Sequence, residues 1–315
     1  MKPHMEAREL TIPLAMANLC NIDGVLVAEA DARIPVLDRG FLFGDSIYEV
    51  LRTEGEVPFA WPEHHARLLA SAASLRLRLD LTEAQLAKRV AATMAAAGNG
   101  DSYVRIIATR GTGAAPNIAL EQATGSPRWV ILVRPLARAT GKPTRLAIVD
   151  RLRNDRRALD PATKSGNYLN NVLGLAEAHD AGATDCLMAN ANGHVAEAST
   201  ANVFALFGRT WCTPPLAAGI LAGITRNLLL DHLTRSGERV EERDIATAEI
   251  RRADELFLCS TLRDISPVTH LDGNERNGGA AGPATSRLMA SFAAYCDQLC
   301  AERYAPHWRR LLGSA

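Results

Sequence analysis

Apolar residues recur along the chain in short segments. Within a segment they return either every second residue, as in a strand, or about every 3.6 residues, as in a helix. The helical spacing predicts helices at 62–79, 82–97, 167–181, 223–237 and 283–304. Gly40 and Gly44 bracket a predicted turn. The strand spacing predicts a hairpin around Asp23-Gly24 and a strand pair over 48–59 that turns at Glu54-Gly55. It predicts further strands at 102–111, 128–136, 144–150, 184–190, 194–200, 201–208, 238–245, 254–261 and 265–273.

The order of these elements predicts two domains. The first covers residues 1–136 and the second, larger one covers 144–315, with the polar, proline-bearing stretch ARATGKP (137–143) as the linker. Each half mixes strands and helices without regular alternation of the two, which predicts an α+β fold. No internal repeat or low-complexity tract is visible.

Composition and charge narrow the class of protein. The chain has 315 residues, of which 47% are hydrophobic and 22% charged, as in an ordinary globular protein. Its 35 basic and 35 acidic residues balance, so no electrostatic argument favours nucleic acid or an anionic membrane as a partner. No apolar run approaches the roughly 20 residues that span a bilayer.

The cysteines and the N-terminus bear on location and on metals. Six cysteines are scattered without a CxxC pair, which favours reduced thiols in a cytoplasmic protein. Cys296 and Cys300 have helical spacing, but they lack two further ligands nearby, so no metal site is predicted. The stretch LTIPLAMANLC (10–20) faintly resembles a signal peptide, but a strand leading into the Asp23-Gly24 turn is the better interpretation.

One lysine stands out from the chain's bias toward arginine. The sequence has 31 arginines and four lysines, Lys2, Lys88, Lys142 and Lys164. Lys164 lies in the segment ALDPATKSGNYLNN, between a predicted strand and a predicted helix, where a side chain can point into a cleft. A partly desolvated lysine can lose its proton and condense with a carbonyl group, which a guanidinium cannot do. The alternative for Lys164 is an ordinary solvated surface charge.

Three further groups of residues fit chemistry at that lysine. Glu197 lies in the apolar strand pair HVAEASTANVF, where a buried carboxylate should face a cation or a protonated base. Gly223 and Thr225 open a predicted helix, whose free N–H groups suit a phosphate. Ser260 and Thr261 add hydroxyl groups at a strand end. An amine, an acid for a ring nitrogen and a phosphate cup are what pyridoxal 5′-phosphate requires.

The motifs also carry a resemblance to a known family. DRGFLFGDSIYEVLRT, TKSGNYLNN, VAEASTANVF, LAGITR and LFLCSTLRDISPV resemble, in this order, the motifs of the class IV aminotransferases, over about residues 18 to 290. That resemblance implies fold type IV, the fold of D-amino acid aminotransferase, and an enzyme dependent on pyridoxal phosphate. It also implies a homodimer in which the small domain of one subunit completes the pocket of the other.

The resemblance implies a role for particular residues. Lys164 would bind the cofactor aldehyde and shuttle the proton, and Glu197 would hydrogen-bond the pyridinium nitrogen. Tyr168 would approach the ring oxygen, although it stands one place nearer the lysine than in some branched-chain enzymes. The ring and the phosphate would be held by Arg67, Leu221, Ile224, Thr225, Ser260 and Thr261, and the substrate would meet Phe43, Tyr48, Tyr103 and Arg105.

Substrate choice is less well defined. Tyr103 and Arg105 resemble branched-chain enzymes, whose arginine holds the distal carboxylate of glutamate, whereas Tyr48-Glu49-Val50 looks more like the D-amino acid enzymes. The Arg-x-His clamp of D-specific members is absent, because this chain has Ala115-Pro116-Asn117 there. A branched-chain or hydrophobic L-amino acid and a 2-oxo acid are therefore the predicted substrates.

Four alternatives remain open on the sequence. They are a D-amino acid aminotransferase, an (R)-amine transaminase, an aminodeoxychorismate lyase, and a non-catalytic relative that only binds vitamin B6. The lyases often have Asn-Arg-Leu where this chain has Asn167-Tyr168-Leu169. The presence of both Lys164 and Glu197 speaks against a non-catalytic protein.

Overall fold

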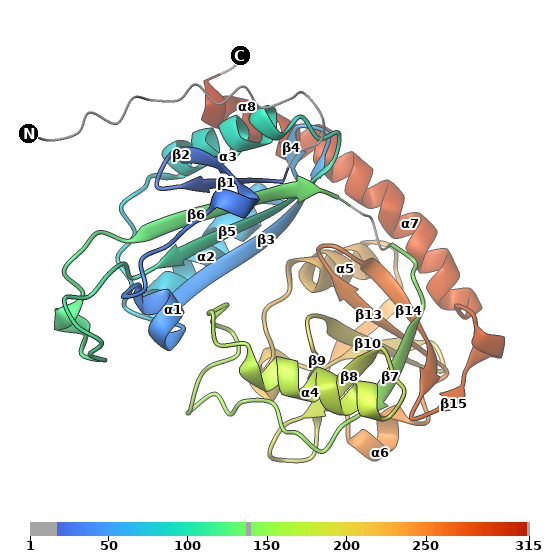
Figure 1. Cartoon of the computed structure of the whole chain (residues 1–315). Coiled ribbons are helices and arrows are strands. Elements are labelled where there is room, and N and C mark those ends of the chain that lie inside the picture. The colour runs from blue at the N-terminus through green and yellow to red at the C-terminus, as the bar shows by residue number, and fades with distance from the viewer. Residues whose placement is uncertain (1–17, 137–139, 314–315) are drawn as a thin grey trace, which may run out of the picture.

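The computed structural model describes residues 18–136 and 140–313. Figure 1 shows two β-sheets side by side, each with its own helices. The fold is α+β, as predicted. The signal-like stretch falls mostly on residues 10–17 and the predicted linker partly on 137–139, and these residues lie outside the described parts of the chain.

The first sheet has the order β2-β1-β6-β5-β3-β4, and all its neighbouring strands are antiparallel. The predicted hairpin around Asp23-Gly24 is confirmed, because both residues take the positive φ that such a turn needs. The strands are β1 (Leu19–Ile22), β2 (Val25–Ala28), β3 (Ser46–Glu54), β4 (Val57–Pro58), β5 (Ser102–Thr109) and β6 (Arg128–Pro135).

Helices α2 (Trp61–Ser74) and α3 (Glu83–Ala97) cover one face of this sheet, and α1 (Arg39–Phe43) precedes β3. Where the sequence predicts only a turn between Gly40 and Gly44, the structure has the short helix α1. The Asp38 carboxylate caps its start by accepting from the Gly40 N–H, and Gly44 ends it in the left-handed conformation.

Strand β3 divides its side chains between the core and the second sheet. Ile47 and Leu51 are buried against the helices in the first core. Tyr48 and Val50 point the other way, because neighbouring side chains of a strand alternate between its two faces. Both of them line a cavity between the sheets. Strand β3 is thus the main support for a site in that cleft.

The second sheet has the order β12-β11-β10-β13-β14-β7-β8-β9, with β15 paired to β14. It is mixed, because β11–β12, β14–β7 and β7–β8 are parallel pairs. The strands are β7 (Thr144–Ile148), β8 (Asp185–Ala189), β9 (Val195–Ala198), β10 (Asn202–Phe207), β11 (Thr210–Thr213), β12 (Arg239–Glu242), β13 (Glu255–Ser260), β14 (Asp264–Leu271) and β15 (Asn274–Glu275).

Both faces of this sheet are buried. In β10, Phe204 and Leu206 pack with the helices α5 (Ile224–Arg235) and α7 (Pro283–Leu299), whereas Val203 and Ala205 belong to a separate core on the opposite side. Helix α4 (Leu169–Asp180) packs on β7 and β8, and the short helix α6 (Thr247–Ile250) precedes β13. Continuous apolar runs such as VFALF are typical of strands buried on both faces.

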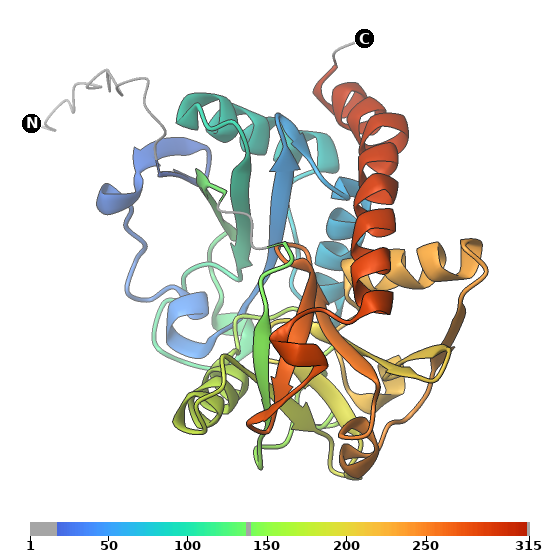
Figure 2. The same ribbon diagram turned by 90° about the vertical axis from the view of Figure 1, so that its right-hand side faces the viewer.

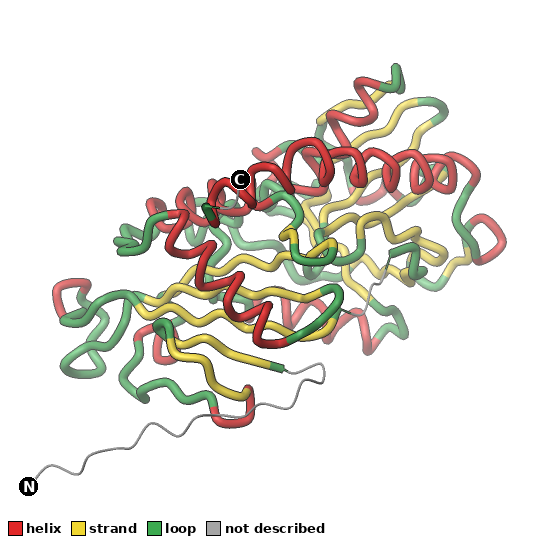
Figure 3. Tube along the Cα trace, turned by 90° about the horizontal axis from the view of Figure 1, so that it is seen from above, coloured by secondary structure: helices red, strands yellow, loops and turns green. Residues whose placement is uncertain are grey.

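The end of the described chain returns to the first sheet. Helix α7 runs from the second sheet toward the first, as Figures 2 and 3 show, and a π-helical segment (Cys300–Tyr304) joins it to α8 (Ala305–Leu312). Trp308 of α8 is buried in the first core, edge-on to Trp61. The division of the chain into domains 1–136 and 144–315 stays a prediction. Helix α8 belongs by sequence to the predicted second domain but packs on the first sheet.

Candidate active site

A cavity of about 380 Å³ lies between the two sheets. A volume of this size is ordinary for a small-molecule site. All but one of the predicted site residues line it, namely Arg67, Tyr48, Tyr103, Arg105, Lys164, Tyr168, Glu197, Leu221, Ile224, Thr225, Ser260 and Thr261. The sequence motifs, which lie far apart along the chain, therefore meet at one place.

Lys164 is held by its main chain before α4 begins. Its carbonyl accepts from the Tyr48 N–H at 3.0 Å, and its own N–H donates to the Ser71 hydroxyl at 3.1 Å. Gly166 allows this close approach, since a Cβ there would lie 2.3 Å from the Ser46 hydroxyl. These contacts tie the lysine segment to β3 and α2, so the amine projects from a rigid support.

Two tyrosine hydroxyls accept hydrogen bonds from the lysine amine. Nζ of Lys164 donates to Tyr168 at 3.1 Å and to Tyr48 at 3.3 Å. The two rings meet edge-on with centroids 5.3 Å apart, and Arg105 lies over the Tyr48 ring at 4.0 Å. Burial, together with the neighbouring Tyr168, raises the pKa of Tyr48, so its hydroxyl stays protonated at neutral pH. Tyr168 therefore contacts the lysine, although it stands one place nearer to it in sequence than in some branched-chain enzymes.

Glu197 lies on β9 and is only 5% exposed. Its carboxylate accepts from Arg153 Nε at 2.9 Å, from the Leu221 N–H at 3.0 Å and from Asn202 Nδ2 at 3.3 Å. The sequence predicts a cation or a protonated base beside this acid but does not identify it. The structure places Arg153, which is buried with it, as a cation at this carboxylate. Nothing in the local pattern around Arg153 distinguishes it from the chain's many other arginines.

Arg67 lines the cavity and is held in place by a buried carboxylate, that of Glu49. Its Nε and Nη2 donate to the two oxygens of Glu49 at 2.8 and 2.7 Å, and its Nη1 donates to the Ala222 carbonyl at 3.0 Å. His64 Nδ1 lies 2.7 Å from the same carboxylate. Burial alone would raise the pKa of Glu49, but the Arg67 charge and these hydrogen bonds outweigh it and lower the pKa to about 2. Burial lowers the pKa of His64, so its ring is neutral at pH 7.

The start of α5 presents free N–H groups to the cavity. No side chain caps this end, and the first N–H groups of a helix have no partner within it. Gly223 is required here, because a Cβ would lie 1.9 Å from Oδ1 of Asn202. Ser260 and Thr261 line the cavity where β13 ends. An anion at this place would meet N–H groups, hydroxyls and the positive end of a helix dipole.

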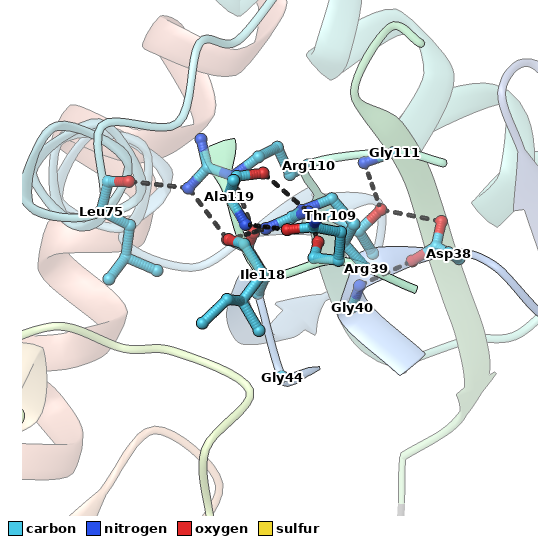
Figure 4. A network of polar contacts seen from close by, with 12 residues as sticks. Asp38, Arg39, Gly40, Gly44, Leu75, Thr109, Arg110, Gly111, Ile118 and Ala119 are labelled. Carbon is cyan, nitrogen blue, oxygen red and sulfur yellow. Dashed lines mark hydrogen bonds and ion pairs between the residues drawn. The ribbon is translucent and has the colours of Figure 1, made fainter. Parts of the chain in front are cut away.

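Phe43 is the predicted site residue that does not line this cavity. It forms the last turn of α1, with its ring 5.2 Å from the guanidinium carbon of Arg39. Figure 4 shows the polar network around α1, in which Arg39 donates to the Ile118 carbonyl at 2.9 Å. A substrate contact by Phe43 stays a prediction, and the structure gives it no support within one chain.

Other cavity residues are not predicted from the sequence. They include Val50 on β3, Asn171 on α4, Ala198 to Asn202 between β9 and β10, and Leu262 and Arg263 after β13. Of these, Val50 could have been found from the alternation of β3, since it lies two places beyond Tyr48. Most of the others lie in loops or at the ends of strands, where periodicity gives no signal, and Asn171 lies in the first turn of α4.

The chain matches the family model for amino-transferase class IV over residues 46–271. It belongs to that family. This class IV aminotransferase is 34% identical over 275 residues to a putative branched-chain-amino-acid aminotransferase of Methanocaldococcus jannaschii, which covers 86% of this chain and 94% of the relative. It is also 30% identical over 270 residues to a D-alanine aminotransferase of Bacillus licheniformis, with the same two coverages.

Solved structures resemble this class IV aminotransferase as well. A branched-chain aminotransferase from Thermoproteus uzoniensis with norvaline superposes with a TM-score of 0.83 at 29% identity, over 92% of this chain and 98% of that one. The enzyme class and the type IV fold expected from the motifs are thus confirmed. Relatives of the branched-chain and D-amino acid types both occur, so the exact substrate is not decided by similarity.

Two kinds of feature are absent from the described residues. No helix among them is long and apolar enough to cross a membrane. No group of three or more His, Cys, Asp or Glu side chains among them could hold a metal ion.

Proposed function

We propose that this class IV aminotransferase uses pyridoxal 5′-phosphate to transfer an amino group from a branched-chain or other hydrophobic L-amino acid to a 2-oxo acid. Class IV aminotransferases use this cofactor. The observation that carries the proposal is one cavity in which the Lys164 amine, the Glu197 carboxylate and the free start of α5 all take part. These are the three groups that the cofactor's aldehyde, ring nitrogen and phosphate need.

The residues present fit the cofactor on structural grounds. The uncapped start of α5 and the remaining N–H groups of Arg67 would hold the phosphate, with Thr225 and Thr261 adding hydroxyls. Glu197 would bind the ring nitrogen, and Leu221, whose N–H already contacts Glu197, would pack on the ring. When bound, the cofactor supplies an electron sink for the substrate's α-carbon. Arg153 and Asn202 donate to the Glu197 carboxylate and so hold it in one orientation.

The chain's own residues would move the proton. Lys164 Nζ, as a free amine, would take the proton from the substrate's α-carbon and give it back at the end of the transfer. The hydroxyls of Tyr48 and Tyr168 hold that amine inside the cavity. Burial keeps the Tyr48 hydroxyl protonated, so it can also donate to a substrate oxygen.

The cavity also supports a choice of substrate. Tyr103 and Arg105 lie on β5 beside the strand that carries Tyr48 and Val50, and all four line the same wall. This wall offers an apolar surface together with one guanidinium, which fits a hydrophobic side chain or the distal carboxylate of glutamate. The absence of an Arg-x-His clamp at 115–117 favours L over D substrates.

A D-amino acid aminotransferase is the second candidate, favoured by the Bacillus licheniformis relative and by Tyr48-Glu49-Val50. A donor panel distinguishes the candidates: L-leucine, L-glutamate, D-alanine and an (R)-amine, each with 2-oxoglutarate and with pyruvate. We expect L-leucine and L-glutamate to be the best donors. Faster turnover of D-alanine would replace the proposal by the second candidate.

The lysine is tested by Lys164→Arg, with Lys88→Arg on the exposed side of α3 as the matched control. Guanidinium stays protonated, so Lys164→Arg should lower turnover by roughly 10²- to 10⁴-fold or more. Lys88→Arg should keep the activity of the unmodified enzyme. Borohydride reduction followed by peptide mapping should place a pyridoxyl group on Lys164, and a label elsewhere would contradict the assignment.

We also propose that the enzyme is a homodimer located in the cytoplasm. Leu169, Val172 and Leu173 on the outer face of α4 are 68%, 57% and 39% exposed, and such an apolar face is typical of a subunit contact. Light scattering should give twice the mass of one chain, and Val172→Asp should lower the measured mass toward that of the monomer.

All six cysteines are free thiols, and five of them are buried, which is consistent with a reducing compartment such as the cytoplasm.

A further inference from the structure

Arg52 is a buried cation that crosses between the two sheets. It lies on β3, on the same strand face as Tyr48 and Val50, and its side chain is only 3% exposed. Its guanidinium lies 4.1 Å over the Phe59 ring, and its Nε is 3.3 Å from Glu54 Oε1. It does not line the cavity, whose wall includes its neighbours on the strand.

The guanidinium group of Arg52 also contacts the turn between β13 and β14. Its Nη1 donates to the Thr261 carbonyl at 3.1 Å and lies 2.8 Å from Asp264 Oδ1 in an ion pair. These two contacts come from a part of the chain more than 200 residues away. Asp264 has a φ of 50°, a conformation that costs energy in a residue other than glycine and that needs outside contacts to persist.

This turn forms one wall of the proposed phosphate cup, because Ser260 and Thr261 line the cavity. The other wall, before α5, has a similar link to the first sheet. There Arg67, which is held by Glu49 of β3, donates to the Ala222 carbonyl at 3.0 Å. Each wall of the cup is therefore joined through an arginine to the same strand, at positions 49 and 52.

We infer that Arg52 is a positioning residue for the cofactor's phosphate, and this inference rests on the proposed function. Arg52 holds the Thr261 wall at a fixed distance from the start of α5. It acts through the turn and touches neither the phosphate nor the substrate. Arginine suits the task because its planar guanidinium uses two nitrogens at once. Nη1 contacts the Thr261 carbonyl and Asp264, and Nε contacts Glu54, whereas a lysine offers a single nitrogen.

The experiment measures the dissociation constants of pyridoxal 5′-phosphate and of pyridoxal, which lacks the phosphate, on the cofactor-free protein. Absorbance reports binding without the need for turnover. The variants are Arg52→Met, which keeps the length without the charge, and Arg52→Lys, which keeps the charge without the fork. The matched control is Arg276→Met. Arg276 also donates to a backbone carbonyl, that of Ala253, but both residues lie in loops beside the second sheet and neither lines the cavity.

For Arg52→Met we expect pyridoxal 5′-phosphate to bind roughly 10- to 100-fold more weakly, the size seen when residues that orient metal ligands are lost. Pyridoxal should bind as it does to the unmodified protein. Arg52→Lys should recover part of the loss, and Arg276→Met should show none. If Arg52→Met does not fold, the same contrast between the two ligands must appear in Arg52→Lys.

Two outcomes would overturn the inference. One is unchanged affinity for pyridoxal 5′-phosphate in both Arg52 variants. The other is an equal loss of affinity for both ligands, which would indicate a general structural defect instead of a phosphate effect. Failure of the unmodified protein to bind pyridoxal 5′-phosphate is a separate result, and it would contradict the proposed function itself.

Discussion

At the scale of single residues, the site depends on charges that are each fixed by more than one partner. Glu197 receives hydrogen bonds from Arg153, Leu221 and Asn202, which lie on three separate segments. Such a carboxylate is held in one orientation, and its charge is compensated inside the protein. A change at either member of the Glu197–Arg153 pair should therefore affect both the stability and the chemistry.

Glu197→Gln removes the charge and leaves the Arg153 side chain, only 7% exposed, without its ion pair. We expect the free energy of unfolding to fall by about 1–3 kcal/mol, the cost of an unsatisfied buried group. Turnover should fall by roughly 10²-fold, because preorganised electrostatic groups contribute at least that much. Denaturant melts and steady-state kinetics measure the two effects.

The control for this variant is Glu177→Gln, whose ion pair with Arg151 is about one-third exposed on both sides. Exposed pairs contribute little, so this change should be almost silent. If Glu197→Gln turns over as fast as the unmodified enzyme, Glu197 has no role in the mechanism.

At the scale of elements, the start of α5 depends on a glycine. Gly223 lets the helix begin against Asn202, the residue that also contacts Glu197. The anion site and the acid site thus share one neighbour, and crowding at Gly223 should disturb both.

Gly223→Ala places a methyl group 1.9 Å from Oδ1 of Asn202. We expect a loss of about 1–3 kcal/mol in the free energy of unfolding, as for other overpacked sites, and weaker cofactor binding. Gly100→Ala is the control, since a Cβ there meets nothing within 4 Å. Equal behaviour of the two variants in thermal melts and cofactor titration would count against a tight helix start.

The contact between α2 and β3 should respond to pH. Burial holds the pKa of His64 below its ordinary value of 6.5, so the unfolded chain takes up this proton more readily. Acidification below about pH 6.5 should therefore lower stability. Glu49, with its pKa near 2, contributes a further loss only below its ordinary value of 4.5. The groups that face His64 include Glu49, Arg67 and Lys164.

Melting temperatures between pH 7.5 and 5 measure this dependence. His64→Gln should flatten the fall below pH 6.5, because glutamine takes up no proton. His179→Gln, on the exposed side of α4, should leave the curve unchanged. The same slope in all three proteins would exclude His64 as the origin.

Local pattern accounts for most elements but not for their contacts. The strands around Tyr48 and Glu197 and the helix after Gly223 follow from periodicity and turn residues. Strand β11 is not predicted, because TWCT is too short and runs into Pro214-Pro215. The partners Arg153 and Arg52 could not be found, because each pairing joins distant segments and arginine is common throughout this chain.

At the scale of the whole molecule, the two sheets are joined by more than the segment between them. Arg52 and Arg67 join the sheets next to the cavity, and α7 with α8 joins them along the outside, as Figure 2 shows. Trp308 is the residue by which α8 enters the first core. The stability of the first core should therefore depend on a residue from the far end of the described chain.

Trp308→Ala should lower the free energy of unfolding by about 3–5 kcal/mol, the usual cost of removing a buried tryptophan. Its indole is 3% exposed and meets Trp61 with ring centroids 4.8 Å apart. Fluorescence-monitored denaturation checks this. Leu173→Ala on the exposed face of α4 serves as the control in monomeric conditions, and a loss no larger than in that control would contradict the role of α8.

The position of α8 also matters while the protein is being made. Ribosomes extend the chain from its N-terminus, so α2 and α3 emerge long before α8. Until α8 follows, Trp61 and its neighbours lack their outer cover and present an apolar surface to chaperones and to other nascent chains. Translation must pass through the entire second sheet before the first core can close.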